Sequence, residues 1–168
     1  PLAGLRIGVL GGWFQVVEPE VRDCTDEATR VLVELGAELV PLEMPLIERI
    51  NPDAVKRVIV VAESAALHDH NLTGYGEIFA QILESGAEVR ATDYIHALRL
   101  RSLLSVSAAG LFDSVDVLVS ATCPIVAPPE TSDVVKLAGR DYVLADIVAR
   151  NTSLFNISGH PAVTVPSG

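Results

Sequence analysis

The chain has 168 residues, of which 49% are apolar and 5% aromatic, and its formal net charge is −10. This length and composition suit one domain with a substantial core of aliphatic side chains. The acidic balance argues against nucleic-acid binding, which needs clustered Lys and Arg, and solubility explains it. No apolar run approaches the roughly 20 residues of a membrane span. We therefore expect a single domain over residues 1–168, with neither a nucleic acid nor a membrane as partner.

The two cysteines indicate a cellular compartment, and the two chain ends indicate that the sequence is part of a larger domain. Cys24 and Cys123 lie far apart and have no metal-binding spacing, which is typical of reduced thiols in the cytoplasm. The sequence begins at Pro1 rather than Met and ends at Gly168, directly after an expected strand. We expect a cytoplasmic protein, and a chain that is a fragment of a larger domain.

The first 42 residues predict a strand–helix–strand unit. Residues 5–10 form a short apolar run closed by two glycines, which indicates a buried strand. Residues 18–35 have apolar side chains at helical spacing, with Pro19 near the first turn and Gly36 as the stop. Residues 37–42 predict a second strand, which lies parallel to the first with a right-handed crossover.

The rest of the chain predicts helices around one further strand. Asn51 should cap a helix that reaches about His70, and Thr92 should cap a longer helix after a short one near residues 75–83. Residues 116–120 indicate a third strand, residues 121–139 an irregular surface loop, and residues 140–150 a modest helix. The fold class is therefore α/β, with helices packed on a mixed, mostly parallel sheet.

The tail, residues 152–168, predicts a turn followed by a buried strand. Asn156 and Gly159 tolerate the backbone conformations of a turn. Pro161 then restricts His160 to extended geometry. Residues 162–165 alternate small and β-branched side chains, which favours a strand inside the core.

The sequence provides no complete catalytic set and no metal or cofactor site. A serine nucleophile needs a base and an oxyanion hole, and neither Lys56 nor Lys136 lies in a motif that would desolvate it. Asp113 and Asp116 flank a strand start and are interpreted as solvated turn residues. The sequence has four histidines, His68, His70, His96 and His160. His68 and His70 are two residues apart and so on different helix faces; they are interpreted as a solvated helix end, and His160 as a polar loop residue.

Four segments, taken in order, resemble the late core of the amidase signature hydrolases. The tail has the form Asn-x-x-Gly-x-Pro-Ala-x-x-x-Pro-x-Gly, and residues 5–8 (LRIG) precede an acidic helix. Residues 93–101 (DYIHALRLR) and 116–128 (DVLVSATCPIVAP) complete the set. One position departs from the family pattern, since Ala121 stands where Pro is usual, while Thr122 and Pro124 fit.

The resemblance implies the C-terminal part of an enzyme core that hydrolyses an amide or transfers ammonia from it. The family uses two serines and a lysine from a Gly/Ser-rich stretch that precedes these segments, and no such stretch occurs here. We therefore assign no catalytic residue. The resemblance implies a substrate-pocket wall at Thr122 and Cys123 and at the turn from Asn156 to Gly159, although packing at the sheet end accounts for these residues equally well.

Three functions stay open. In the first, the chain is part of an amidase that acts on a small-molecule amide, or of an amidotransferase subunit, and the isolated chain is inactive. The second is a non-enzymatic α/β interaction module that forms homo-oligomers through exposed core surface and open sheet edges. The third is nucleotide binding at Gly11 and Gly12, but their Gly-x-x-Gly-Gly spacing is neither dinucleotide fingerprint nor phosphate loop.

Overall fold

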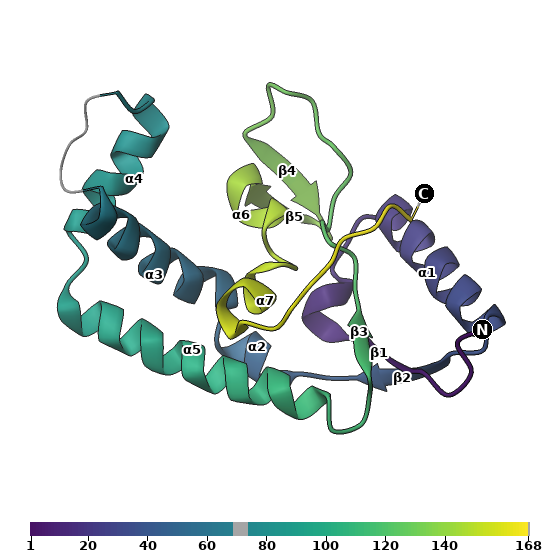
Figure 1. The fold of residues 1–168 in the computed structure, drawn as a ribbon. Helices are drawn as coiled ribbons and strands as arrows, with labels where there is room; N and C mark the ends of the chain where they lie inside the picture. The colour runs from purple at the N-terminus through teal and green to yellow at the C-terminus, as the bar shows by residue number, and fades with distance from the viewer. Residues whose placement is uncertain (69–73, 168) are drawn as a thin grey trace.

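The computed structural model of the chain describes residues 1–68 and 74–167. His70, where the second long helix was expected to end, and the terminal Gly168 lie outside the described residues. Within the described residues, helices and strands alternate only up to β2; four consecutive helices, three strands and two short helices follow (Figure 1). In chain order they are β1 Arg6–Leu10, the 3₁₀-helix η1 Gly12–Gln15, α1 Pro19–Glu34, β2 Glu38–Leu42, α2 Pro45–Arg49, α3 Pro52–Leu67, α4 Glu77–Ala87, α5 Ala91–Leu111, β3 Val117–Val119, β4 Val134–Leu137, β5 Arg140–Val143, α6 Leu144–Val148 and α7 Ser153–Ser158.

A three-stranded parallel sheet with the order β2-β1-β3 forms one half of the fold. Ile7 on the central strand pairs with Leu39 on one side and Val117 on the other. The expected β1–α1–β2 unit with parallel strands is confirmed. Gly8 allows the close packing across this sheet, because a Cβ there would lie 2.6 Å from the side chain of Leu42 and 2.7 Å from that of Leu118.

Helix α3 packs on both α4 and α5 at the other side of the molecule (Figure 1). The predicted cap of α3 is confirmed, since Asn51 Oδ1 accepts hydrogen bonds from the backbone N–H of Asp53 (2.9 Å) and Ala54 (3.3 Å). The predicted Thr92 cap of α5 is wrong, because the helix already begins at Ala91 after Arg90. The Arg90 side chain binds Asp93 in the first turn at 2.8 Å and does not cap through a hydroxyl.

A β-hairpin replaces part of the predicted loop and part of the predicted helix. Strands β4 and β5 pair antiparallel within residues 134–143, and only α6 remains of the helix expected over residues 140–150. Leu137 pairs with Arg140, so Ala138 and Gly139 alone make the turn, with φ of 49° and 76°. Positive φ at both positions matches the twist of the strands, and pairing across this turn outweighs the helical tendency of the sequence that follows.

The tail also differs from the prediction. The expected turn at Asn156 is the short helix α7, which ends at Gly159 in the left-handed conformation with φ of 80°. Residues 162–165 form no strand and are exposed, Val163 to 87%. A strand is stabilised by a paired neighbour, and the described chain offers this segment no backbone ladder. The tail passes the segment that follows β3 (Figure 1).

Two apolar clusters contain most of the buried hydrophobic side chains among the described residues. The larger joins the sheet to the helices; its buried members are Leu10, Trp13, Phe14, Met44, Ile47, Val55, Ile59, Ala97, Leu104, Ala108, Leu111, Leu154 and Ile157. The smaller lies under the hairpin and contains Ile125, Leu137 and Ile147. Within residues 1–68 and 74–167, no helix is long and apolar enough to cross a membrane.

Candidate functional site

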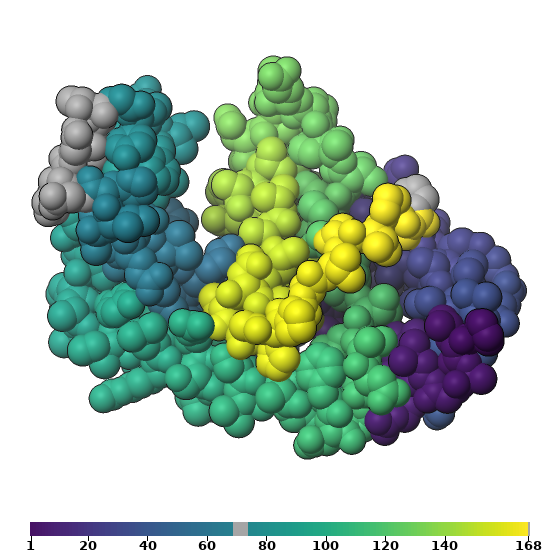
Figure 2. All heavy atoms as spheres, viewed as in Figure 1, coloured from purple at the N-terminus to yellow at the C-terminus, as the bar shows by residue number. Residues whose placement is uncertain are grey.

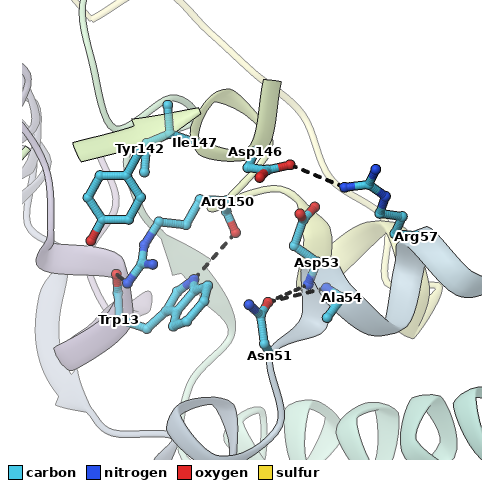
Figure 3. A pocket seen from close by; sticks show the side chains of 9 residues that line it. All are labelled: Trp13, Asn51, Asp53, Ala54, Arg57, Tyr142, Asp146, Ile147 and Arg150. Atoms are coloured by element: carbon cyan, nitrogen blue, oxygen red, sulfur yellow. Dashed lines mark hydrogen bonds and ion pairs between the residues drawn. The ribbon is translucent and has the colours of Figure 1, made fainter. Parts of the chain in front are cut away.

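A cavity of about 300 Å³ opens between the start of α3 and the hairpin side of the molecule. Figure 2 shows the hollow between these two parts of the surface, and Figure 3 shows the side chains around the cavity. The lining combines aromatic, charged and amide groups; its residues are Trp13, Asn51, Asp53, Ala54, Arg57, Tyr142, Asp146, Ile147 and Arg150. A pocket of this size and mixed lining suits a small polar ligand.

Arg150 and Trp13 form one wall of the cavity as a stacked pair (Figure 3). The guanidinium carbon lies 3.5 Å from the centre of the indole ring, within the range of a cation–π contact. Two hydrogen bonds fix the pair, from Trp13 Nε1 to the Arg150 carbonyl (3.4 Å) and from Arg150 Nη2 to the Trp13 carbonyl (3.3 Å). Burial lowers the pKa of Arg150, while Tyr142 and Glu48 act in the opposite direction.

Lys56, Asp53 and Ser153 form a polar cluster behind the opposite wall. Lys56 Nζ lies 2.7 Å from Asp53 Oδ1 and donates to Ser153 Oγ at 2.9 Å. The Ser153 hydroxyl lies 2.8 Å from Asp53 Oδ1 and 2.7 Å from the Ala149 carbonyl, and it is fully buried. The side chain of Lys56 is only 20% exposed, which no sequence motif around it indicated. The cluster ties α7 to α3 and presents no accessible nucleophile.

The sequence model of the amidase family matches residues 1–168, the whole chain. The chain belongs to the amidase family. An amidase from Pseudomonas putida is 37% identical over 98% of this chain and 36% of its own length. A glutamyl-tRNA(Gln) amidotransferase subunit from Caldanaerobacter subterraneus subsp. tengcongensis is 26% identical over 99% of this chain and 39% of its own length. The chain therefore spans just over a third of the length of these relatives.

The fold also agrees with that of solved amidases. An amidase crystal structure superposes with a TM-score of 0.83, at 22% identity, over 94% of this chain and 37% of its own. The likeness confirms the α/β class of the chain, with helices and a parallel sheet. The resemblance inferred from the four sequence segments is thereby confirmed at the level of the family.

None of the four residues expected in the amidase pocket wall lines the cavity. The exposed Thr122 has its hydroxyl 3.3 Å from that of Thr164 in the tail, so the loop and the tail do meet. Cys123 packs on the small apolar cluster under the hairpin. Asn156 is exposed on α7, and Gly159 ends that helix. Cys123 therefore has a packing role and Gly159 a backbone role, whereas Thr122 and Asn156 remain accessible.

Asn151 connects the loop at Thr122 with the cavity. Its side chain is 1% exposed, and its Nδ2 donates to the Ala121 carbonyl at 2.9 Å. Its Oδ1 is buried and has no hydrogen-bond partner among the described residues. Because Asn151 directly follows Arg150, the loop of the amidase pattern and the cavity wall are held by neighbouring residues.

The other sequence candidates have structural roles. His68 Nδ1 lies 2.6 Å from the Tyr75 hydroxyl, and His160 stacks on Phe112. The residues that the structure describes contain no group of three or more metal-ligating side chains. A Cβ at Gly11 would collide with the Glu43 carboxylate, so this loop faces a negative charge that disfavours phosphate.

Sequence reasoning missed most of the cavity lining. Trp13 is the single tryptophan and directly follows the paired glycines, yet its partner Arg150 is 137 residues away. Asn51 was recognised only as a cap, and Tyr142, Asp146 and Arg150 were assigned to a modest helix. Nothing local in the sequence brings these residues together, because the hairpin and the turn after α6 decide where they lie.

Proposed function

We propose that this chain contributes the C-terminal part of the core of an amidase that cleaves small-molecule carboxamides, or transfers ammonia from them, through a serine acyl-enzyme. In that chemistry the serine oxygen bonds to the carbonyl carbon, the C–N bond breaks, and ammonia or an amine leaves with a proton. Water or an acceptor then releases the acyl group. The two serines and the lysine of the triad lie outside residues 1–168, so the isolated chain is inactive.

The observation that carries this proposal is the family match over the whole chain. A second observation supports the absence of activity in the isolated chain: in the described part, the only buried serine–lysine contact, between Ser153 and Lys56, is closed to substrate. Ser153 is closed to substrate, and Lys56 is bound to a carboxylate at 2.7 Å. Nucleophilic catalysis needs a base beside an accessible hydroxyl, and the hydroxyl in this cluster is buried.

Within this proposal, the loop at Thr122 and Cys123 and the end of α7 at Asn156 and Gly159 form part of the substrate-pocket wall. Two features support the assignment: Thr122 and Asn156 are exposed, and Asn151 clamps the Ala121 carbonyl next to Thr122. A Thr122→Ala change in the active full-length protein should raise KM more than it lowers kcat. Unchanged kinetics would contradict this assignment and favour the alternative, that the loop only packs at the end of the sheet.

The proposal is tested by ammonia release from benzamide and acetamide. The purified 168-residue chain should release none above background, whereas the full-length polypeptide that carries this sequence should be active. The full-length Ser153→Ala variant is the matched control and should keep its activity, because Ser153 is a structural tie. Turnover by the isolated chain, or loss of turnover in the folded variant, would refute the proposal.

A second candidate function is self-association of the chain as an interaction module. Large apolar side chains stand in solvent on several elements, among them Leu67 (80% exposed), Ile78 (78%) and Val106 (73%). Both outer strands of the sheet, β2 and β3, have one unpaired edge within the described chain, and such edges favour association. Light scattering over a range of concentrations tests this candidate, and a monomer at the highest concentration contradicts it.

We also infer that the protein works in the cytoplasm. The support is the pair of cysteines, since Cys24 and Cys123 are both free thiols, as is usual in a reducing compartment. Fractionation of cells that express the tagged full-length protein tests this inference, and recovery in a secreted fraction contradicts it.

A further inference from the structure

We propose that the cavity beside α3 is a binding site for a small-molecule carboxylate, with Arg150 as the residue that anchors it. Such a site recognises the acid group of a ligand, whether or not the chain takes part in amide cleavage. The argument starts from the charge of Arg150 and continues with the other groups that line the cavity.

Arg150 is a half-buried cation without a counterion. It makes no ion pair within residues 1–68 and 74–167, and its Nε is buried without a hydrogen-bond partner there. Of the five N–H donors of a guanidinium, one makes a hydrogen bond in the described structure, from Nη2 to the Trp13 carbonyl. A charge removed from water is costly unless it is paired. A bound carboxylate would supply the missing partner in the planar geometry that arginine favours.

The two carboxylates in the lining do not fill that place, because each already has a cation of its own. Asp53 lies 2.7 Å from Lys56. Asp146 lies 3.7 Å from Arg57, as Figure 3 shows for this second pair. Glu48 favours the charged form of Arg150 from a distance but forms no ion pair with it within the described part of the chain. The cation that is left without a direct partner at the cavity is therefore Arg150.

The remaining lining suits the rest of an acid-bearing molecule. Asn51 uses its oxygen to cap α3, so its amide N–H₂ group is left on the side toward Trp13 (Figure 3). This amide and the Tyr142 hydroxyl can donate further hydrogen bonds to an anion. Ile147 and Ala54 add apolar surface. The volume of about 300 Å³ lies at the lower end of the range for ligand pockets, which favours a compact ligand such as an aromatic or short-chain acid.

Isothermal titration calorimetry with benzoate tests the proposal on the full-length polypeptide. Benzyl alcohol is the neutral ligand of similar shape. Benzoate should bind with a Kd of about 1 mM or tighter, and benzyl alcohol at least tenfold more weakly. Arg150→Gln should weaken benzoate binding about tenfold or more, as expected for a lost charged hydrogen bond. The same change at Arg99, which is exposed on α5, should leave the Kd unchanged.

Folding is controlled separately, because Arg150 also packs on Trp13. If Arg150→Gln fails to show a wild-type far-UV spectrum, Asn51→Ser replaces it. Serine caps a helix about as well as asparagine but lacks the amide N–H₂, so α3 should survive while benzoate binding weakens several-fold. Absence of benzoate binding to the folded wild type overturns the proposal, as does equal binding by either folded variant.

A final measurement separates the two sources of the carboxylate. If the acid group belongs to the amide substrate, benzoate should inhibit amide turnover competitively, and this arm rests on the proposed function. If the acid is a separate ligand, benzoate should bind without competing with substrate. Because calorimetry needs no turnover, an inactive protein that still binds benzoate would refute the amidase proposal and leave the carboxylate site standing.

Discussion

Replacing Gly86 by alanine tests how closely α4 packs on α3. Gly86 is buried at the crossing of the two helices, and a Cβ there would lie 2.6 Å from the Val61 carbonyl carbon, 2.9 Å from the Ala65 Cβ, and closer still to the Val61 oxygen. Real Cβ atoms do not approach backbone this closely. Because the obstacle is the main chain of α3 and not the tip of a flexible side chain, the two helices must move apart.

The size of the effect follows from two opposing contributions. Alanine is a better helix former than glycine by about 1 kcal/mol. Overpacking a well-packed contact costs about 1–3 kcal/mol and occasionally more, and a clash with rigid backbone belongs at the upper end of that range. The expected net loss in the free energy of unfolding is about 2 kcal/mol, or about 4–8 °C in Tm for a chain of this size.

Gly110→Ala is the matched control for this experiment. Gly110 also lies in a helix, α5, but is exposed, and a Cβ there would have no heavy atom within 4 Å. Only the gain in helix propensity applies, so this variant should be more stable by about 0.5–1 kcal/mol. Urea unfolding followed by far-UV circular dichroism measures both variants. A Gly86→Ala protein as stable as the wild type would show that α3 and α4 are not in backbone contact.

Three further changes test other contacts. Ser153→Ala removes the hydrogen bonds that join Lys56 and Asp53 of α3 to α7 and should lower the free energy of unfolding by about 1–2 kcal/mol. An unchanged urea midpoint would contradict this role of Ser153. Ala138→Asn should stabilise the hairpin by about 0.5–1 kcal/mol, because asparagine tolerates the positive φ of 49° at this position; a lower Tm contradicts the turn geometry. The Arg6 hydrogen bonds lower the pKa of Asp116 below its unfolded value, so their stabilisation is present above about pH 4 and lost as the pH falls through the folded pKa. The stability difference between wild type and Asp116→Asn should therefore be larger at neutral pH than near pH 3, and a difference independent of pH would contradict the ion pair.

Signals carried by neighbouring residues predicted the fold most successfully. Asn51 followed by Pro52 correctly marked the start of α3, and the apolar run closed by Gly11 correctly marked β1. Each of these depends on hydrogen bonds or steric limits within a few residues. The predictions failed where the structure has a hairpin over residues 134–143 and an unpaired tail over residues 162–165. Both outcomes depend on which segments find a partner strand.

The sequence by itself determined the family, the α/β class and the succession of most elements, because ordered motifs and residue periodicity are local properties of the chain. Only the tertiary structure brought Arg150 onto Trp13 across 137 positions and buried Ser153 between Lys56 and Asp53. Those contacts come from the packing of η1, α3 and α7 around one core. Their energies depend on burial and partner geometry, which no stretch of neighbouring residues specifies.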